Sequence, residues 1–176
     1  MSIEEKLSEL EIKKILVVDD REENLDAAKQ YFQTINLHVE YATNAKDAID
    51  KMKAAYEKEE KYDFILSDLE METKTAGLDV VKEALEQRSY VTIASGVNYD
   101  KSDTDQHGPN TTIRPTGTSI KGKKEKPEVW KFALEESLNY IQTYKESPEF
   151  KAIERYAHFI GILPENIIDM LKIKYE

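Results

Sequence analysis

The stretch Ile15-Leu16-Val17-Val18-Asp19-Asp20 is an apolar run that ends in two acids. Two further runs also end in polar side chains: Phe64-Ile65-Leu66-Ser67 is followed by Asp68, and Val91-Thr92-Ile93-Ala94 is followed by Ser95. Short apolar runs of this kind are typical of buried strands in a parallel sheet. Ligands of such sheets bind beyond the carboxyl ends of the strands. We therefore expect three carboxylates and one hydroxyl along a single edge of the sheet.

Amphipathic helical patterns separate these runs, and this alternation is the signature of βαβ units. Right-handed crossovers between parallel strands would place helices on both faces of a central sheet. The fold class predicted from the pattern is therefore α/β. The expected strands are residues 13–18, 37–41, 62–67 and 90–95, and the expected helices are residues 21–35, 45–60, 77–87 and 127–145.

The pattern fails between Gly96 and Lys126, where the chain is polar and rich in Thr, Asp, Lys and Gly. Residues 118–120 are the candidate for a short final strand. About 30 residues without regular structure are unusual inside a compact domain, so this stretch is either a functional loop or is wrongly assigned. We expect an N-terminal helical segment at 1–11, a domain at 12–145 and a C-terminal helical extension at 146–176.

Composition narrows the class of protein. The chain has 176 residues, of which 40% are hydrophobic, and this is enough for a real core. A net charge of −10 argues against a nucleic-acid surface, which would need a basic patch. The absence of Cys excludes disulfides and thiolate metal sites. No apolar run approaches the roughly 20 residues of a membrane span, so we expect an acidic cytoplasmic protein without nucleic-acid or membrane partners.

Clustered carboxylates without Cys or a nearby His suit a hard cation such as Mg²⁺. At this point the residues resemble the receiver domain of two-component response regulators. The opening ILVVDDREENL of residues 15–25 is a close match, and residues 65–71 followed by Gly77-Leu78 are a second one. Ser95-Gly96 and Lys126-Pro127 are weaker matches. The resemblance covers about residues 12–145 and implies a flavodoxin-like, doubly wound, five-stranded parallel sheet of order 2-1-3-4-5, with further helices C-terminal to it.

The resemblance implies a role for each of these residues. Asp68 would accept a phosphoryl group from a sensor histidine kinase, a phosphotransfer protein or a small phosphodonor. Asp20 would bind Mg²⁺ directly and Asp19 through water, with Asp68 and the Glu70 backbone carbonyl completing the metal site. Ser95 would hydrogen-bond a phosphoryl oxygen, and a lysine would pair with another. Such a protein is not an enzyme beyond Mg²⁺-dependent self-phosphorylation and self-dephosphorylation.

The sequence departs from the family pattern at several places. Glu72 stands where the family usually has Pro, and the segment from Asp68 to Gly77 is one residue longer than usual. The segment before Lys126 is also long and lacks the family's fourth helix. Lys123 occupies the place of the family's switch aromatic. Lys126 is the first candidate for the site lysine, but if Pro127 is simply the first residue of a helix, Lys124 takes that place.

Two other functions remain open from the sequence. The chain could be a receiver-like interaction module that no longer takes phosphate, which the missing switch aromatic favours and the intact acids oppose. It could also be a phosphohydrolase resembling the haloacid dehalogenase group. That group has two acids separated by one residue after its first strand, but Arg21 stands at the second place and Asp68 would be unexplained.

Overall fold

The computed structural model describes residues 1–74, 76–94 and 124–144. In this part of the chain four parallel strands form one sheet of order β2-β1-β3-β4, which confirms the predicted order 2-1-3-4. The fifth strand expected near residues 118–120 lies outside the described residues. The strands are β1 (Lys14–Val18), β2 (His38–Ala42), β3 (Phe64–Ser67) and β4 (Tyr90–Ile93).

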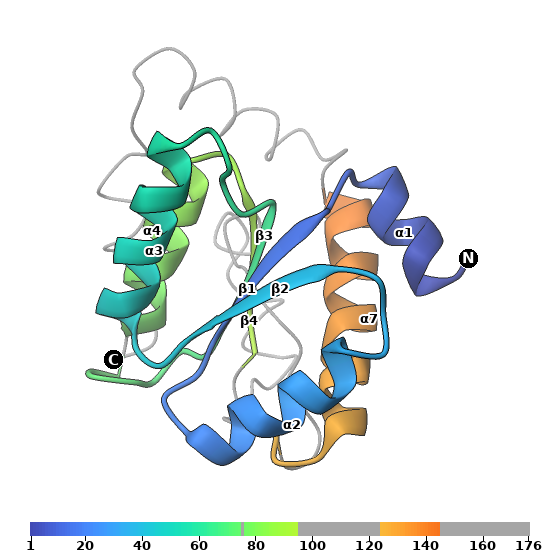
Figure 1. The fold of residues 1–176 in the computed structure, drawn as a ribbon, viewed down its shortest axis with the longest axis horizontal. Coiled ribbons are helices and arrows are strands. Elements are labelled where there is room, and N and C mark those ends of the chain that lie inside the picture. The colour runs from blue at the N-terminus through green and yellow to red at the C-terminus, as the bar shows by residue number, and fades with distance from the viewer. Residues whose placement is uncertain (75, 95–123, 145–176) are drawn as a thin grey trace, which may run out of the picture.

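Five helices cover the two faces of the sheet within the described residues (Figure 1). Helices α3 and α4 pack against each other on one face, and α2 and α7 pack together on the other, with α1 beside α7. The expected helices on both faces are therefore confirmed. Their bounds are α1 (Ile3–Glu9), α2 (Glu22–Phe32), α3 (Ala45–Glu57), α4 (Ala76–Glu86) and α7 (Pro127–Tyr144). None of these helices is long and apolar enough to cross a membrane.

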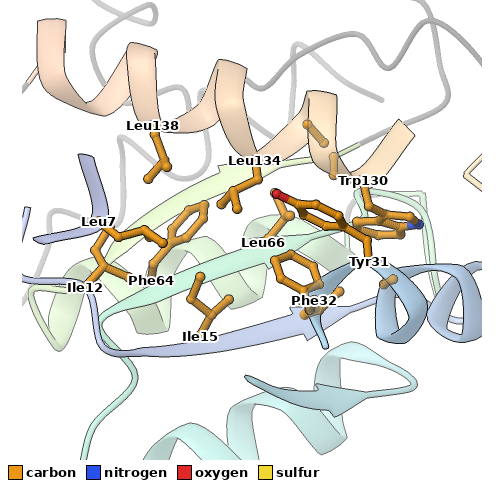
Figure 2. Packing of buried hydrophobic residues seen from close by; sticks show 14 of the residues in the cluster. Leu7, Ile12, Ile15, Tyr31, Phe32, Phe64, Leu66, Trp130, Leu134 and Leu138 are labelled. Atoms are coloured by element: carbon orange, nitrogen blue, oxygen red, sulfur yellow. The ribbon is translucent and has the colours of Figure 1, made fainter. Parts of the chain in front are cut away.

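The central strands are buried on both faces, which explains why their sequences are continuous apolar runs. Side chains alternate along a strand, so Ile15 and Val17 enter the core under α2 and α7 while Leu16 and Val18 enter the core under α3 and α4. Figure 2 shows the first of these cores, where Phe32 and Trp130 meet the strand side chains.

Helix α1 belongs to the same core as α7. A capping box between Ser2 and Glu5 begins the helix, and its apolar face buries Leu7 and Leu10. Its polar face is also bound to α7, since Lys6 Nζ donates to the side-chain oxygen of Asn139 at 2.6 Å. The N-terminal segment that the sequence set apart is thus packed against the last described helix.

Three helices end in the same way. The residues after α1, α3 and α4 adopt left-handed backbone conformations at Glu11, Glu59 and Arg88, with φ of 57°, 59° and 59°. In each case the next N–H group reaches back five residues to a helix carbonyl, which together with the i−3 bond of the left-handed residue defines a Schellman motif. These bonds are Ile12 to Leu7, Glu60 to Ala55 and Ser89 to Ala84.

Candidate functional site

The pairing of β1 and β3 brings acids from distant parts of the sequence together. Val18 is in register with Ser67, so Asp19 and Asp68 leave the same edge of the sheet as neighbours. Asp19, Asp20 and Asp68 each offer a carboxylate oxygen, and these three oxygens all lie within 4.8 Å of one another. Asp19 is fully buried, Asp68 is partly buried and Asp20 is exposed. The predicted cluster of three carboxylates is therefore present at the carboxyl edge of the sheet.

Lys124 lies against two of these acids. Its Nζ forms ion pairs with Asp19 Oδ2 at 2.7 Å and Asp68 Oδ1 at 3.1 Å, and it donates a hydrogen bond to the carbonyl oxygen of Ala94 at 2.9 Å. Lys126, the first candidate from the sequence, instead lies at the start of α7, where its carbonyl oxygen accepts from the Val129 N–H group. Among the described residues it is thus Lys124 that the fold brings to the acids.

Three neighbours that the sequence did not single out for this site hydrogen-bond to Asp19 or Lys124. Asp19 Oδ1 accepts from the side-chain amide of Asn24 at 3.1 Å and from the Arg21 N–H group at 3.0 Å. Trp130, in the first turn of α7, is fully buried and donates its indole N–H to the Lys124 carbonyl oxygen at 2.7 Å. The helices at 21–35 and 127–145 were expected from the sequence, but these three polar contacts were not.

The electrostatics of the site are unbalanced. Burial raises the pKa of Asp68 to about 6, with Lys124 opposing this effect and the carboxylate of Asp19 adding to it. Among the residues that the structure describes, three clustered carboxylates are accompanied by one lysine, Lys124, which leaves an excess of negative charge. A divalent cation with oxygen ligands would offset that charge, so the donor set fits Mg²⁺.

The loop between β3 and α4 is built around Asp68. The Leu69 N–H group donates to Asp68 Oδ1 at 2.9 Å, and Leu69 itself is buried. Helix α4 begins directly against this backbone, because the Gly77 N–H group donates to the Leu69 carbonyl oxygen at 2.8 Å. A Cβ atom at position 77 would collide with the Asp68 carbonyl oxygen and would lie 2.7 Å from the Leu69 Cα atom. Glycine is therefore required at this position of the second sequence motif.

Two more site residues were predicted from the sequence, Glu70 through its backbone carbonyl and Ser95 through its hydroxyl. Glu70 is exposed in the same loop, one residue after Leu69. Ser95 lies outside the described residues. Glu72, which the sequence marked only as a departure from the family pattern, accepts hydrogen bonds at the start of α3 from the N–H groups of Ala45 at 2.8 Å and Lys46 at 3.1 Å. Burial raises its pKa, but these backbone donors outweigh that effect and the pKa of Glu72 lies below its ordinary value.

The comparisons with known proteins agree with this architecture. The family model of the response regulator receiver domain matches residues 15–107, and the chain belongs to this family. No match was found among the curated proteins.

Among solved structures, the chain resembles the chemotaxis response regulator CheY4 of Vibrio cholerae, with 22% identity and a TM-score of 0.54 over 72% of this chain and 98% of that one. A second structure of CheY4, crystallised at low pH, gives 23% identity and a TM-score of 0.52 over 70% and 97% of the two chains. The bacteriophytochrome response regulator AtBRR has 14% identity and a TM-score of 0.50, over 73% of this chain and 93% of that one. At these identities the likeness establishes the fold.

Proposed function

We propose that this protein is a phosphorylatable response-regulator receiver that accepts a phosphoryl group on Asp68 with the help of Mg²⁺ and signals through protein contacts. The observation that carries the proposal is the meeting of Asp19, Asp20 and Asp68 with Lys124 at the carboxyl edge of the sheet. In a member of the receiver family this arrangement combines a nucleophile, a cation site and a positive side chain.

Asp68 acts as the nucleophile in this scheme. An oxygen of its carboxylate attacks the phosphorus of a phosphohistidine, the P–N bond breaks, and the bonding electron pair stays on the imidazole nitrogen. With a pKa of about 6, Asp68 is mostly ionised at neutral pH and so is competent for this attack.

The other members stabilise charge. Asp19, Asp20, Asp68 and the Glu70 carbonyl oxygen would hold Mg²⁺, which supplies positive charge to the phosphoryl oxygens during transfer. Lys124 Nζ already lies 3.1 Å from Asp68, so it can pair with a phosphoryl oxygen once one is present. Ser95 would donate to another oxygen.

The partners follow from this chemistry. A histidine kinase or a phosphotransfer protein would supply the phosphoryl group, and another protein would receive the signal. The net charge of −10 favours protein partners over nucleic acid, and we place this exchange in the cytoplasm.

Intact-protein mass spectrometry after incubation with acetyl phosphate tests the proposal. We expect a Mg²⁺-dependent phosphoryl adduct on the wild type and none on Asp68→Asn. The matched control is Asp50→Asn, which removes an exposed carboxylate paired with Lys46 on α3 and should leave the adduct intact. If the wild type formed no adduct and also failed to bind beryllofluoride, the phosphorylation proposal would be wrong and the chain would be a receiver-shaped interaction module.

A further inference from the structure

The loop that carries Asp68 is tied to a helix on the other side of the site. Both oxygens of Glu72 are engaged at the start of α3, Oε1 by the Ala45 N–H group at 2.8 Å and Oε2 by the Lys46 N–H group at 3.1 Å. Glu72 and Ala45 are 27 positions apart in the sequence. Helix starts leave N–H groups without intrahelical partners, and here a residue from outside the helix satisfies two of them with a charged acceptor.

Helix α3 does not depend on Glu72 alone for its start. Asn44 is its N-cap residue, and the side-chain oxygen of Asn44 accepts from the Asp47 N–H group at 2.7 Å. Asn44 therefore caps the helix from within its own segment, whereas Glu72 joins the helix to the loop. Substitution of Asn44 should therefore affect the stability of α3, whereas substitution of Glu72 should also affect the position of the loop.

The contact between Glu72 and the start of α3 lies two residues from Glu70, whose backbone carbonyl is the proposed metal ligand. On one side of Glu70 the chain is fixed at Leu69, which is buried and whose carbonyl oxygen accepts from the Gly77 N–H group at 2.8 Å. On the other side it is fixed at Glu72 by the two bonds to α3. The Met71 N–H group, next to the Glu70 carbonyl in the chain, also donates to the Thr73 carbonyl oxygen at 3.0 Å. The backbone carbonyl of Glu70 is thus held from both ends.

We propose that Glu72 is a positioning residue for the phosphorylation site, and that its bidentate contact with the start of α3 holds the Glu70 carbonyl oxygen where it can bind Mg²⁺. The inference rests on the proposed function, since it concerns the affinity of that site for its cation. It also explains the departure at position 72. A proline stiffens a loop by fixing its own φ angle, whereas Glu72 restrains the longer loop of this chain by a contact with a distant helix.

Mg²⁺ binding measured by calorimetry on the full chain tests this role. Removal of an outer contact that orients a metal ligand typically lowers metal affinity by about 10–100-fold. Glu72 is exposed, so we expect Glu72→Ala to raise the Kd for Mg²⁺ by about 3–10-fold. Glu72→Gln keeps one acceptor oxygen, so its Kd for Mg²⁺ should lie between those of the wild type and Glu72→Ala. The control is Asn44→Ala, which removes a cap from the same helix end but no contact to the loop, and which should leave the Kd unchanged.

Amide NMR signals provide a second readout, which monitors the contact between Glu72 and the N–H groups of Ala45 and Lys46. In ¹⁵N-resolved spectra of the wild type, the amide signals of Ala45 and Lys46 should shift during a Mg²⁺ titration, because the loop that binds the ion is bonded to them. The same two signals should stop responding in Glu72→Ala and keep responding in Asn44→Ala. A residue that merely stabilised α3 would not separate the two variants in this way.

The outcomes distinguish the two proposals. If the wild type binds Mg²⁺ and Glu72→Ala binds it equally well, the positioning role is wrong and the proposed function stands. Equal weakening in Glu72→Ala and Asn44→Ala would also overturn the role, because the effect would then come from the stability of α3. If the wild type binds no Mg²⁺, the proposed function fails and the positioning role fails with it. Should Glu72→Ala not fold, Glu72→Gln and Asn44→Ala provide the same comparison.

Discussion

At the scale of single residues, Asp68 is held in its ionised form at a cost to the folded state. Its pKa is raised from 3.8 to about 6, chiefly by burial. Below pH 3.8 the group is protonated in both states and costs nothing. As pH rises from 4 to 6 the unfolded chain loses this proton first, so the contribution of Asp68 lowers the stability of the folded protein. Above pH 6 the penalty stays constant.

Asp68→Asn should therefore stabilise the protein in the absence of Mg²⁺. We expect the free energy of unfolding at pH 7.5 to rise by about 1–3 kcal/mol relative to the wild type, and the difference to vanish near pH 4. Urea denaturation in buffer with EDTA, at both pH values, measures this directly. Carboxylates that do not interact with Asp68 are shared by the two proteins and cancel in the difference. A variant less stable than the wild type at pH 7.5 would mean that the ion pair with Lys124 outweighs the cost of burial.

At the scale of elements, three helices end on residues that are poorly suited to their backbone conformation. Glu11, Glu59 and Arg88 all have φ near +58°, a region that side chains with a Cβ atom rarely adopt. Left-handed geometry costs an L-residue about 1–2 kcal/mol, and a glycine loses about 0.5–1 kcal/mol more chain entropy on folding. The difference favours glycine at each of these three positions.

We expect Glu59→Gly, at the end of α3, to stabilise the protein by about 0.5–1 kcal/mol, as judged from these two opposing costs. The matched control is Lys53→Gly, an exposed position in the middle of the same helix, which should destabilise by about 1 kcal/mol. Thermal unfolding of the two variants and the wild type measures both stability changes, an increase for Glu59→Gly and a decrease for Lys53→Gly. Loss of stability in both variants would show that the left-handed residue carries no strain.

At the scale of the whole molecule, binding of a cation to the native state must stabilise the entire fold. At ten times its Kd, Mg²⁺ should add about 1.4 kcal/mol, which for a domain of this size raises Tm by roughly 3–6 °C. The control is Asp20→Asn, because Asp20 is exposed and its loss should leave the metal-free Tm nearly unchanged while abolishing most of the Mg²⁺ effect. An equal rise of Tm in this variant would indicate that the ion binds elsewhere.

The fold was predictable because its decisive signals are local. Residues 15–20 and 64–68 are apolar runs that end in acids, and such runs identify buried parallel strands and the edge at which their acids meet. The site lysine was not settled by the same logic, because the sequence offers four lysines between residues 121 and 126. Only the bonds of Lys124 to Asp19, Asp68 and Ala94 distinguish it from Lys126. The bond between Glu72 and Ala45 spans 27 positions, and no local pattern encodes it.

The packing of α1 on α7 has a consequence for the order of events during synthesis. Lys6 and Asn139 are 133 positions apart, and ribosomes add about 5–20 residues per second. The apolar face of α1, with Leu7 and Leu10, is therefore synthesised about 7–27 s before its partner on α7. During that interval Leu7 and Leu10 have no α7 to pack against, and transiently exposed apolar surface of this kind is prone to aggregation and is what chaperones protect. Helix α1 is therefore made well before α7, yet its packing is completed only when α7 follows.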